Sequence, residues 1–237
     1  MRKTEASYKR VVDTLKQGWA PLAQNNKSFT EMWEKGELTT EAAERFTGLM
    51  HSIIMAPSIA AAQSQAFLGT KHLIDIGGGS GAFCMAFAVN YPGMHATVMD
   101  LPQVCEVAKK NVEKLGLLEK VSFFPCNFFR DSWPTDGDAF LVSNILHDWP
   151  LPQCKEILQK AYEALPVGGR MFVHEILLDE GKTSPKMAVV FDFLMYMNHR
   201  SQQFTFNELQ KLLTEVGFKN PKIVNQFGYY SLVVAEK

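Results

Sequence analysis

The chain has 237 residues and a hydrophobic content of 46%, enough for a buried core and too high for disorder over most of its length. Lysine and arginine number 24 against 25 aspartates and glutamates, so the net charge of -1 gives no reason to expect a nucleic-acid partner. The polar N-terminus and the lack of an apolar run of about 18 residues predict a cytoplasmic chain without a membrane span. The balanced charge favours a small-molecule partner instead, and four widely spaced cysteines without a metal-binding pattern predict that no metal is bound.

The first part of the chain, residues 1–70, is predicted to be helical. Apolar residues recur at helical spacing in three stretches, near 8–19, 40–54 and 57–67. No convincing strand pattern occurs among them. We therefore expect a helical segment that precedes a second unit, residues 71–237.

From residue 72 onward, short β-rich runs such as HLIDIG, ATVMD and AFLVSNIL alternate with helical patterns. Such alternation predicts a Rossmann-like, doubly wound, mainly parallel sheet covered by helices on both faces. The last two runs, KIVNQF and YYSLVVAEK, are separated only by a turn at Gly228 and predict an antiparallel hairpin. The expected fold class is therefore α/β, with a seven-stranded sheet that ends in this hairpin.

A glycine-rich stretch, DIGGGSG, follows the first strand run and should form the turn into the next helix. It contains Gly77, Gly78, Gly79 and Gly81, which let the backbone approach a ligand closely. The N-terminus of the following helix supplies free N–H groups. A glycine loop alone is a weak signal, because many such loops are only tight turns.

Asp100 closes the second strand run, 21 residues after Gly79. This is close to the spacing of about 20 residues expected for a carboxylate that binds ribose hydroxyls. An alternative role is a helix N-cap before Leu101 and Pro102, and the two roles can coexist.

The same loop also satisfies a looser dinucleotide fingerprint, Gly77-x-Gly79-x-x-Ala82. An NAD(P)-dependent oxidoreductase is thus one alternative. Against it stands Asp75, still on the strand, which suits a positively charged amino acid group better than a pyrophosphate.

Several motifs together resemble a known family. They are LIDIGGGSGAF, TVMDLPQV, NFFRD, NILHDWP, LPVGGRMFVHEILLDE and FTFNELQKLLTEVGF. Their order resembles the family of plant caffeic acid and bacterial polyketide O-methyltransferases, which includes the hydroxyindole (acetylserotonin) O-methyltransferases. The resemblance implies a class I enzyme that uses S-adenosyl-L-methionine to methylate a hydroxyl of a small aromatic or polyketide-like molecule.

The resemblance also implies catalytic roles. His147, within LHDW, falls on the family's general base, and Glu175 on the carboxylate that orients it. Histidine has a pKa near 6.5 and a phenol one near 10, so a neutral imidazole can take the proton as the oxygen attacks. A second acidic residue of the family is replaced here by Gln203, which positions an imidazole but stabilises its charge less well.

For the cofactor, the resemblance implies contacts beyond the glycine loop and Asp100. Asn127 replaces the family's usual acid at the adenine amino group and can still accept a hydrogen bond. Asp148 either caps its turn or holds the cofactor, and Trp149 either lines the adenine site or belongs to the core. The further cofactor-binding candidates are Leu101, Phe128, Ser143 and Asn144.

The acceptor pocket is the least defined part of the prediction. Met50 lies in ERFTGLMHS, which resembles the family's helix that closes over the cofactor. The other acceptor candidates are Asp192, Met195, Asn198 and His199. Because Gln203 departs from the pattern, N- or C-methylation and non-methylating chemistry such as decarboxylation or cyclisation stay open. The family's N-terminal winged-helix dimerisation domain has no match here, so we expect at most a weakened homodimer.

Overall fold

The computed structural model describes residues 2–17, 29–199 and 201–237. The helices are α1 (Arg2–Gln17), α2 (Phe29–Lys35), α3 (Thr40–Ala62), α4 (Ala82–Asn90), α5 (Pro102–Lys114), α6 (Leu151–Ala164), α7 (Lys186–His199) and α8 (Phe206–Val216), with short 3-10 turns η1 (Gln65–Phe67) and η2 (Leu146–Asp148). The strands are β1 (His72–Ile76), β2 (His95–Asp100), β3 (Val121–Pro125), β4 (Ala139–Ser143), β5 (Arg170–Ile176), β6 (Lys219–Phe227) and β7 (Tyr230–Glu236).

The strands form one seven-stranded sheet in the order β3-β2-β1-β4-β5-β7-β6. The first five strands pair in parallel, whereas β7 runs antiparallel to both β5 and β6. The predicted sheet and its terminal hairpin are therefore confirmed. The strand order reverses between β1 and β4, and open α/β sheets bind ligands at the carboxyl ends of the strands at such a point.

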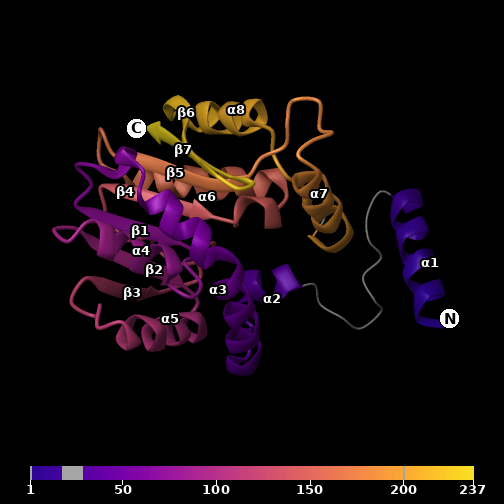
Figure 1. Cartoon of the computed structure of the whole chain (residues 1–237), viewed down its shortest axis with the longest axis horizontal. Coiled ribbons are helices and arrows are strands. Elements are labelled where there is room, and N and C mark those ends of the chain that lie inside the picture. Colours follow the sequence, from indigo (N-terminus) through magenta and orange to yellow (C-terminus); the bar gives the residue numbers. More distant parts are fainter. Residues whose placement is uncertain (1, 18–28, 200) are drawn as a thin grey trace.

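Side chains alternate between the two faces of the sheet, and each face packs into its own apolar layer. On β1, Ile74 and Ile76 pack into the layer that holds α6 and α8, and Leu73 packs into the layer that holds α4 and α5. The same alternation runs along β4, β5 and β7, as the period of two in a strand requires. Burial on both faces holds the strand ends rigidly, and Figure 1 shows helices on both sides of the sheet.

The predicted helical segment ends in one long helix, α3. We expected a break before Pro57, but α3 continues through that residue. A proline inside a helix loses one backbone hydrogen bond, and α3 tolerates this because it packs against α4 and α5. The boundary at residue 70 stays a prediction, since α3 and the sheet share one apolar layer through Ala61 and Phe67.

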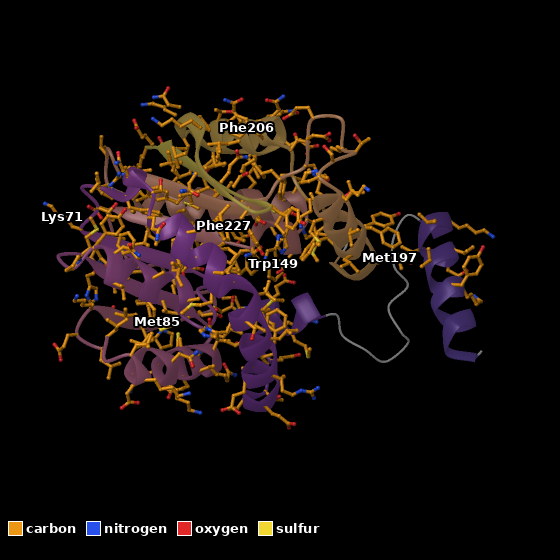
Figure 2. The ribbon with its side chains drawn as sticks, viewed as in Figure 1. Lys71, Met85, Trp149, Met197, Phe206 and Phe227 are labelled. Carbon is orange, nitrogen blue, oxygen red and sulfur yellow. The ribbon has the colours of Figure 1, made fainter. Side chains whose placement is uncertain are left out.

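The carboxyl ends of the parallel strands point toward α2, α3 and α7 (Figure 1). Lys71, at the opposite end of β1, lies far from Trp149 at the centre of the molecule (Figure 2). Strand β4 ends at Ser143, earlier than the predicted run to residue 146, because Asn144 adopts a left-handed φ of 54° and starts the turn into η2. Among the described helices, none is long and apolar enough to cross a membrane.

Candidate active site

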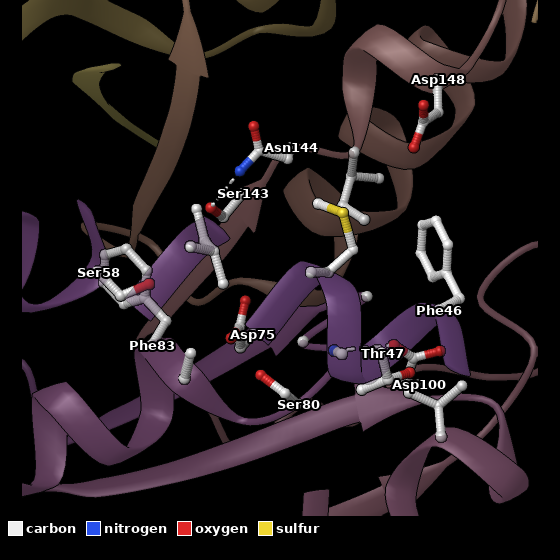
Figure 3. Close-up of a pocket in the computed structure, with 18 of the residues that line it drawn as sticks. Phe46, Thr47, Ser58, Asp75, Ser80, Phe83, Asp100, Ser143, Asn144 and Asp148 are labelled. Carbon is white, nitrogen blue, oxygen red and sulfur yellow. Dashed lines mark hydrogen bonds between the residues drawn. The ribbon is translucent and has the colours of Figure 1, made fainter. Parts of the chain in front are cut away.

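A cavity with about 890 Å³ of empty space lies at the carboxyl ends of β1, β2 and β4, between the sheet and α3 (Figure 3). Most of the predicted cofactor residues line it, as does Met50. Those that do so are Asp75, Gly77, Gly78, Gly79, Asp100, Phe128, Ser143, Asn144, Asp148 and Trp149. The structure thus brings these residues together, while their individual roles stay predictions.

The glycine loop has a backbone that larger residues would not adopt. Gly77 and Gly79 have φ values of 64° and 55°. A Cβ on Gly77 would lie 2.5 Å from the Cδ1 atom of Ile145, and one on Gly78 would lie 3.0 Å from Oδ2 of Asp75. The loop therefore leaves space directly above β1 that only glycine keeps open.

Asp75 is buried at the end of β1 and lines the cavity. Its Oδ2 atom accepts a weak hydrogen bond from the Cys84 thiol at 3.8 Å. Burial, and after it the negative charge of Asp100, raises the pKa of Asp75 to about 8. A positively charged group bound in the cavity would favour the ionised carboxylate.

Asp100 ends β2 with its carboxylate held by backbone N–H groups. Oδ2 accepts from Gly79 at 2.9 Å and Oδ1 accepts from Leu101 at 2.7 Å. Burial raises the pKa of Asp100 to about 6, and hydrogen bonds from these two amides and the Trp33 indole oppose the rise. The N-cap alternative is wrong, because the N-cap position of α5 is occupied by Leu101.

His147 and Glu175 form a buried pair. Nδ1 of His147 lies 2.6 Å from Oε2 of Glu175, whose Oε1 accepts the N–H of Leu146 at 3.1 Å. Burial alone would lower the pKa of His147, but the charges of Glu175 and Asp148 and the hydrogen bond to Glu175 together raise it to about 9. Because the proton on Nδ1 is held by Glu175, Nε2 is the atom left for a substrate.

The imidazole lies beside the cavity. Its Nε2 atom is 3.7 Å from Oδ1 of Asp148, which lines the cavity, whereas His147 itself does not line it. Helix α7 packs against η2, the turn that carries His147. An acceptor would therefore reach Nε2 from the side of Asp148 and α7.

Aromatic side chains close the cavity. The Phe128 ring lies 6.1 Å from Trp149 with near-perpendicular planes, and Trp33 meets Phe46 edge to face at 5.1 Å. All four rings line the cavity, so this part of its wall is apolar. Trp149 also belongs to the core, as one of its two predicted roles requires, and its role at the adenine site stays a prediction.

Three predicted cofactor residues do not line the cavity. Gly81 begins α4 with its Cα packed toward Val98, and Leu101 contributes its backbone N–H to Asp100. The Asn127 amide nitrogen donates to the carbonyl of Glu34 at 2.9 Å, and its oxygen accepts from the N–H of Phe129 at 3.1 Å. These bonds join Asn127 to the end of α2, and its contact with adenine stays a prediction.

Gln203, Asp192 and Met195, predicted for catalysis and for the acceptor, do not line the main cavity. Gln203 is fully buried with no hydrogen bond to either amide atom among the described residues, so no bond links it to His147. Asp192 accepts the backbone N–H of Gln203 at 2.8 Å. It lines a second hollow, and Trp149 lines both this hollow and the main cavity. Met195 on α7 lines neither space.

Two further acceptor candidates, Asn198 and His199, end α7, and their side chains lie outside the described residues. Within the part of the chain that is described, no group of three or more His, Cys, Asp or Glu residues is placed to hold a metal ion.

The sequence reasoning missed several residues of the site. Trp33, Ser58 and Ser80 line the cavity. Ser80 Oγ lies 2.9 Å from Nδ1 of His51, which joins the glycine loop to α3. Ser80 lies within the DIGGGSG stretch, where only the glycines were predicted to bind, whereas Trp33 and Ser58 lie in no distinctive motif and reach the strand ends through the tertiary packing of α2 and α3.

Comparison with known proteins identifies the family of this chain. The model of the O-methyltransferase domain family matches residues 9–219. Acetylserotonin O-methyltransferase of Bos taurus is 33% identical over 165 residues, which are 70% of this chain and 47% of that protein. The 3-hydroxy-5-methyl-1-naphthoate 3-O-methyltransferase of Streptomyces sahachiroi is 32% identical over 156 residues, 66% of this chain and 45% of that protein. The chain thus spans about half the length of these relatives.

The fold also matches solved structures. Human N-acetylserotonin methyltransferase in complex with SAM superposes with a TM-score of 0.82 at 24% identity, covering 97% of this chain and 66% of that one. The alternative of an oxidoreductase is not favoured by any of these matches. The family expected from the motifs is confirmed, and the chain belongs to the O-methyltransferase domain family.

Proposed function

We propose that this chain is an S-adenosylmethionine-dependent O-methyltransferase that acts on a hydroxyl of a small aromatic or polyketide-like molecule. The relatives that it resembles are O-methyltransferases of acetylserotonin and of a naphthoate. The observation that carries the proposal is the contact of 2.6 Å between His147 and Glu175, beside a cavity that holds two buried acids.

The residues of the cavity fit this cofactor. Asp75 is a buried carboxyl group that faces the cavity, and among the described residues that line it none is Lys, Arg or His. A cationic ligand therefore meets negative potential and no repulsion. The open glycine loop leaves room for a nucleoside, and Asp100 closes β2 at the spacing for ribose hydroxyls.

When bound, S-adenosylmethionine supplies a methyl group activated by the sulfonium, so no metal is required. Asp75 binds the ammonium group and Asp100 the ribose hydroxyls, while the aromatic walls exclude water. His147 takes the acceptor proton at Nε2, and Glu175 stabilises the resulting imidazolium. A nearby positive charge disfavours imidazolium, so His147 gives up its resting proton more easily in the loaded site.

The test is product formation by the purified chain with S-adenosylmethionine and a panel of phenolic acceptors. We expect a product heavier by one methyl group, carried on oxygen. His147→Ala should reduce turnover by about 100-fold or more and change cofactor affinity less than about twofold. His95→Ala, a histidine bonded to Ser122 at the far end of the sheet, is the matched control.

Undiminished turnover in the His147→Ala variant would remove the base assignment. A product that lacks carbon dioxide, or one methylated on nitrogen or carbon, would overturn the proposed reaction. Light scattering of the same preparation tests the predicted weak homodimer.

A further inference from the structure

One polar atom that lines the cavity has no hydrogen-bond partner among the described residues. Ser58, on α3, is fully buried and lines the cavity, and its hydroxyl makes no hydrogen bond to any described residue. Serines in helices usually bond to a carbonyl one turn back, as Ser52 on the same helix does with Gly48 at 3.4 Å. An unsatisfied buried hydroxyl destabilises the protein unless a ligand completes it.

The other serines of the cavity are already engaged. Ser80 is bonded to His51 at 2.9 Å, and Ser143 is bonded to Nδ1 of His174 at 2.9 Å. His174 is buried, and this burial lowers its pKa to about 3, so it stays neutral and holds Ser143 without adding charge. Among these three serines, Ser58 is the one whose O–H is free to donate to a ligand.

The position of Ser58 indicates which part of a ligand it meets. In Figure 3, Ser58 and Phe83 lie at one end of the cavity, Asp75 lies between, and Asp100 and Phe46 lie at the other end. If Asp100 binds the ribose, the amino acid arm extends past Asp75 toward Ser58. The ammonium group of this arm can pair with the Asp75 carboxylate. The carboxylate on the same carbon then needs hydrogen-bond donors from nearby residues.

We propose that the Ser58 hydroxyl donates a hydrogen bond to the α-carboxylate of the cofactor's amino acid arm. This inference rests on the proposed function, since it assumes that the cavity binds S-adenosylmethionine. The described lining offers no basic side chain, so a neutral donor on α3, the Ser58 hydroxyl, takes the place that Lys or Arg would otherwise fill. Binding of the arm thereby links α3 to the strand ends.

Calorimetry with two ligands tests the proposal. The ligands are S-adenosylhomocysteine and its decarboxylated analogue, 5′-(3-aminopropylthio)-5′-deoxyadenosine, which keeps the ammonium group and lacks the carboxylate. Ser58→Ala should weaken binding of the first by about tenfold or more, as expected for a bond to a charged group, and change binding of the second less than about twofold. Ser52→Ala, exposed on the same helix, should affect neither ligand.

Thermal unfolding without ligand provides a second measurement that does not depend on binding. Ser58→Ala should melt at the same temperature as wild type or higher, because it removes an unsatisfied buried hydroxyl. Equal losses for both ligands, or unchanged affinity for S-adenosylhomocysteine, would overturn the role of Ser58. Wild-type protein that binds neither ligand would instead overturn the proposed function itself, and this inference with it.

Discussion

Replacing Glu175 with Gln tests whether the charge of this residue sets the proton affinity of His147. In the wild type the pKa of His147 is raised to about 9, so only about one imidazole in a hundred is neutral at pH 7. In the Glu175→Gln variant, burial acts to lower the pKa, and Asp148 is left as the acid that raises it. We expect the pKa of His147 to fall to about 6.5 or lower.

The amide keeps the size and shape of the side chain while it removes the charge. Glu175 accepts from Nδ1 of His147 with Oε2 and from the N–H of Leu146 with Oε1, whereas Gln has a single oxygen, so the variant keeps the bond to His147 and loses the bond to Leu146. With saturating cofactor, wild-type kcat/KM for the acceptor should rise up to about tenfold per pH unit above pH 7, until it levels off at or below about pH 9. The variant should be nearly flat over that range, with a plateau about 10 to 100-fold lower because its base is weaker.

The assay measures both enzymes from pH 6 to 10, together with the imidazole NMR signals of the free proteins. A His147→Asn sample identifies the resonance of interest. Glu156→Gln, which changes an exposed acid on α6, is the control and should keep the wild-type profile. If wild type and Glu175→Gln share one midpoint in both measurements, the electrostatic reasoning is refuted.

Two further substitutions probe the cofactor side of the cavity. The pKa of Asp75 is raised above its unfolded value, so the contribution of this residue to stability is full below about pH 4 and is lost as the pH rises through about 8. Asp75→Asn should therefore add about 2 kcal/mol to the unfolding free energy of the ligand-free protein at pH 9, as measured by urea titration. The same variant should bind the cofactor more weakly. Gly77→Ala places a Cβ 2.5 Å from Ile145 at a positive φ and should lower the unfolding free energy by about 1 to 3 kcal/mol in the same titration. The control is Gly93→Ala, whose Cβ would have nothing within 4 Å and which should change the unfolding free energy by less than about 1 kcal/mol.

Much of the site was predictable because its signals are local in the sequence. The glycine loop and Asp100 lie on adjacent elements whose spacing follows from one strand, one helix and the next strand. Glu175 lies at the end of β5 and His147 lies in η2, the turn that follows the neighbouring parallel strand β4, so their meeting agrees with the sheet order. Local patterns suffice where the backbone itself carries a residue to the site.

Other residues could not be predicted, because their partners lie far away in the sequence. Asn127 sits where the family has an acid, yet its amide is used by the carbonyls at the end of α2, more than 90 residues earlier. Pro57 suggested a helix break, but packing against α4 and α5 outweighs one lost hydrogen bond. The Trp33 indole meets Asp100 only because α2 folds over the strand ends.

The ligand-free cavity combines several features that oppose stability. Asp75 is buried without a cationic partner among the residues that line the cavity, and Ser58 has an unused hydroxyl. Each such group costs free energy in the ligand-free protein, because burial reduces its hydration and no side chain of the cavity wall replaces the lost hydrogen bonds. A ligand with an ammonium, a sulfonium and a carboxylate would pair with all of these groups. Binding would then relieve the free-energy cost of their burial, and this relief would add to the binding affinity. The unpaired groups of this cavity are therefore complementary to the charges of the ligand that we expect it to bind.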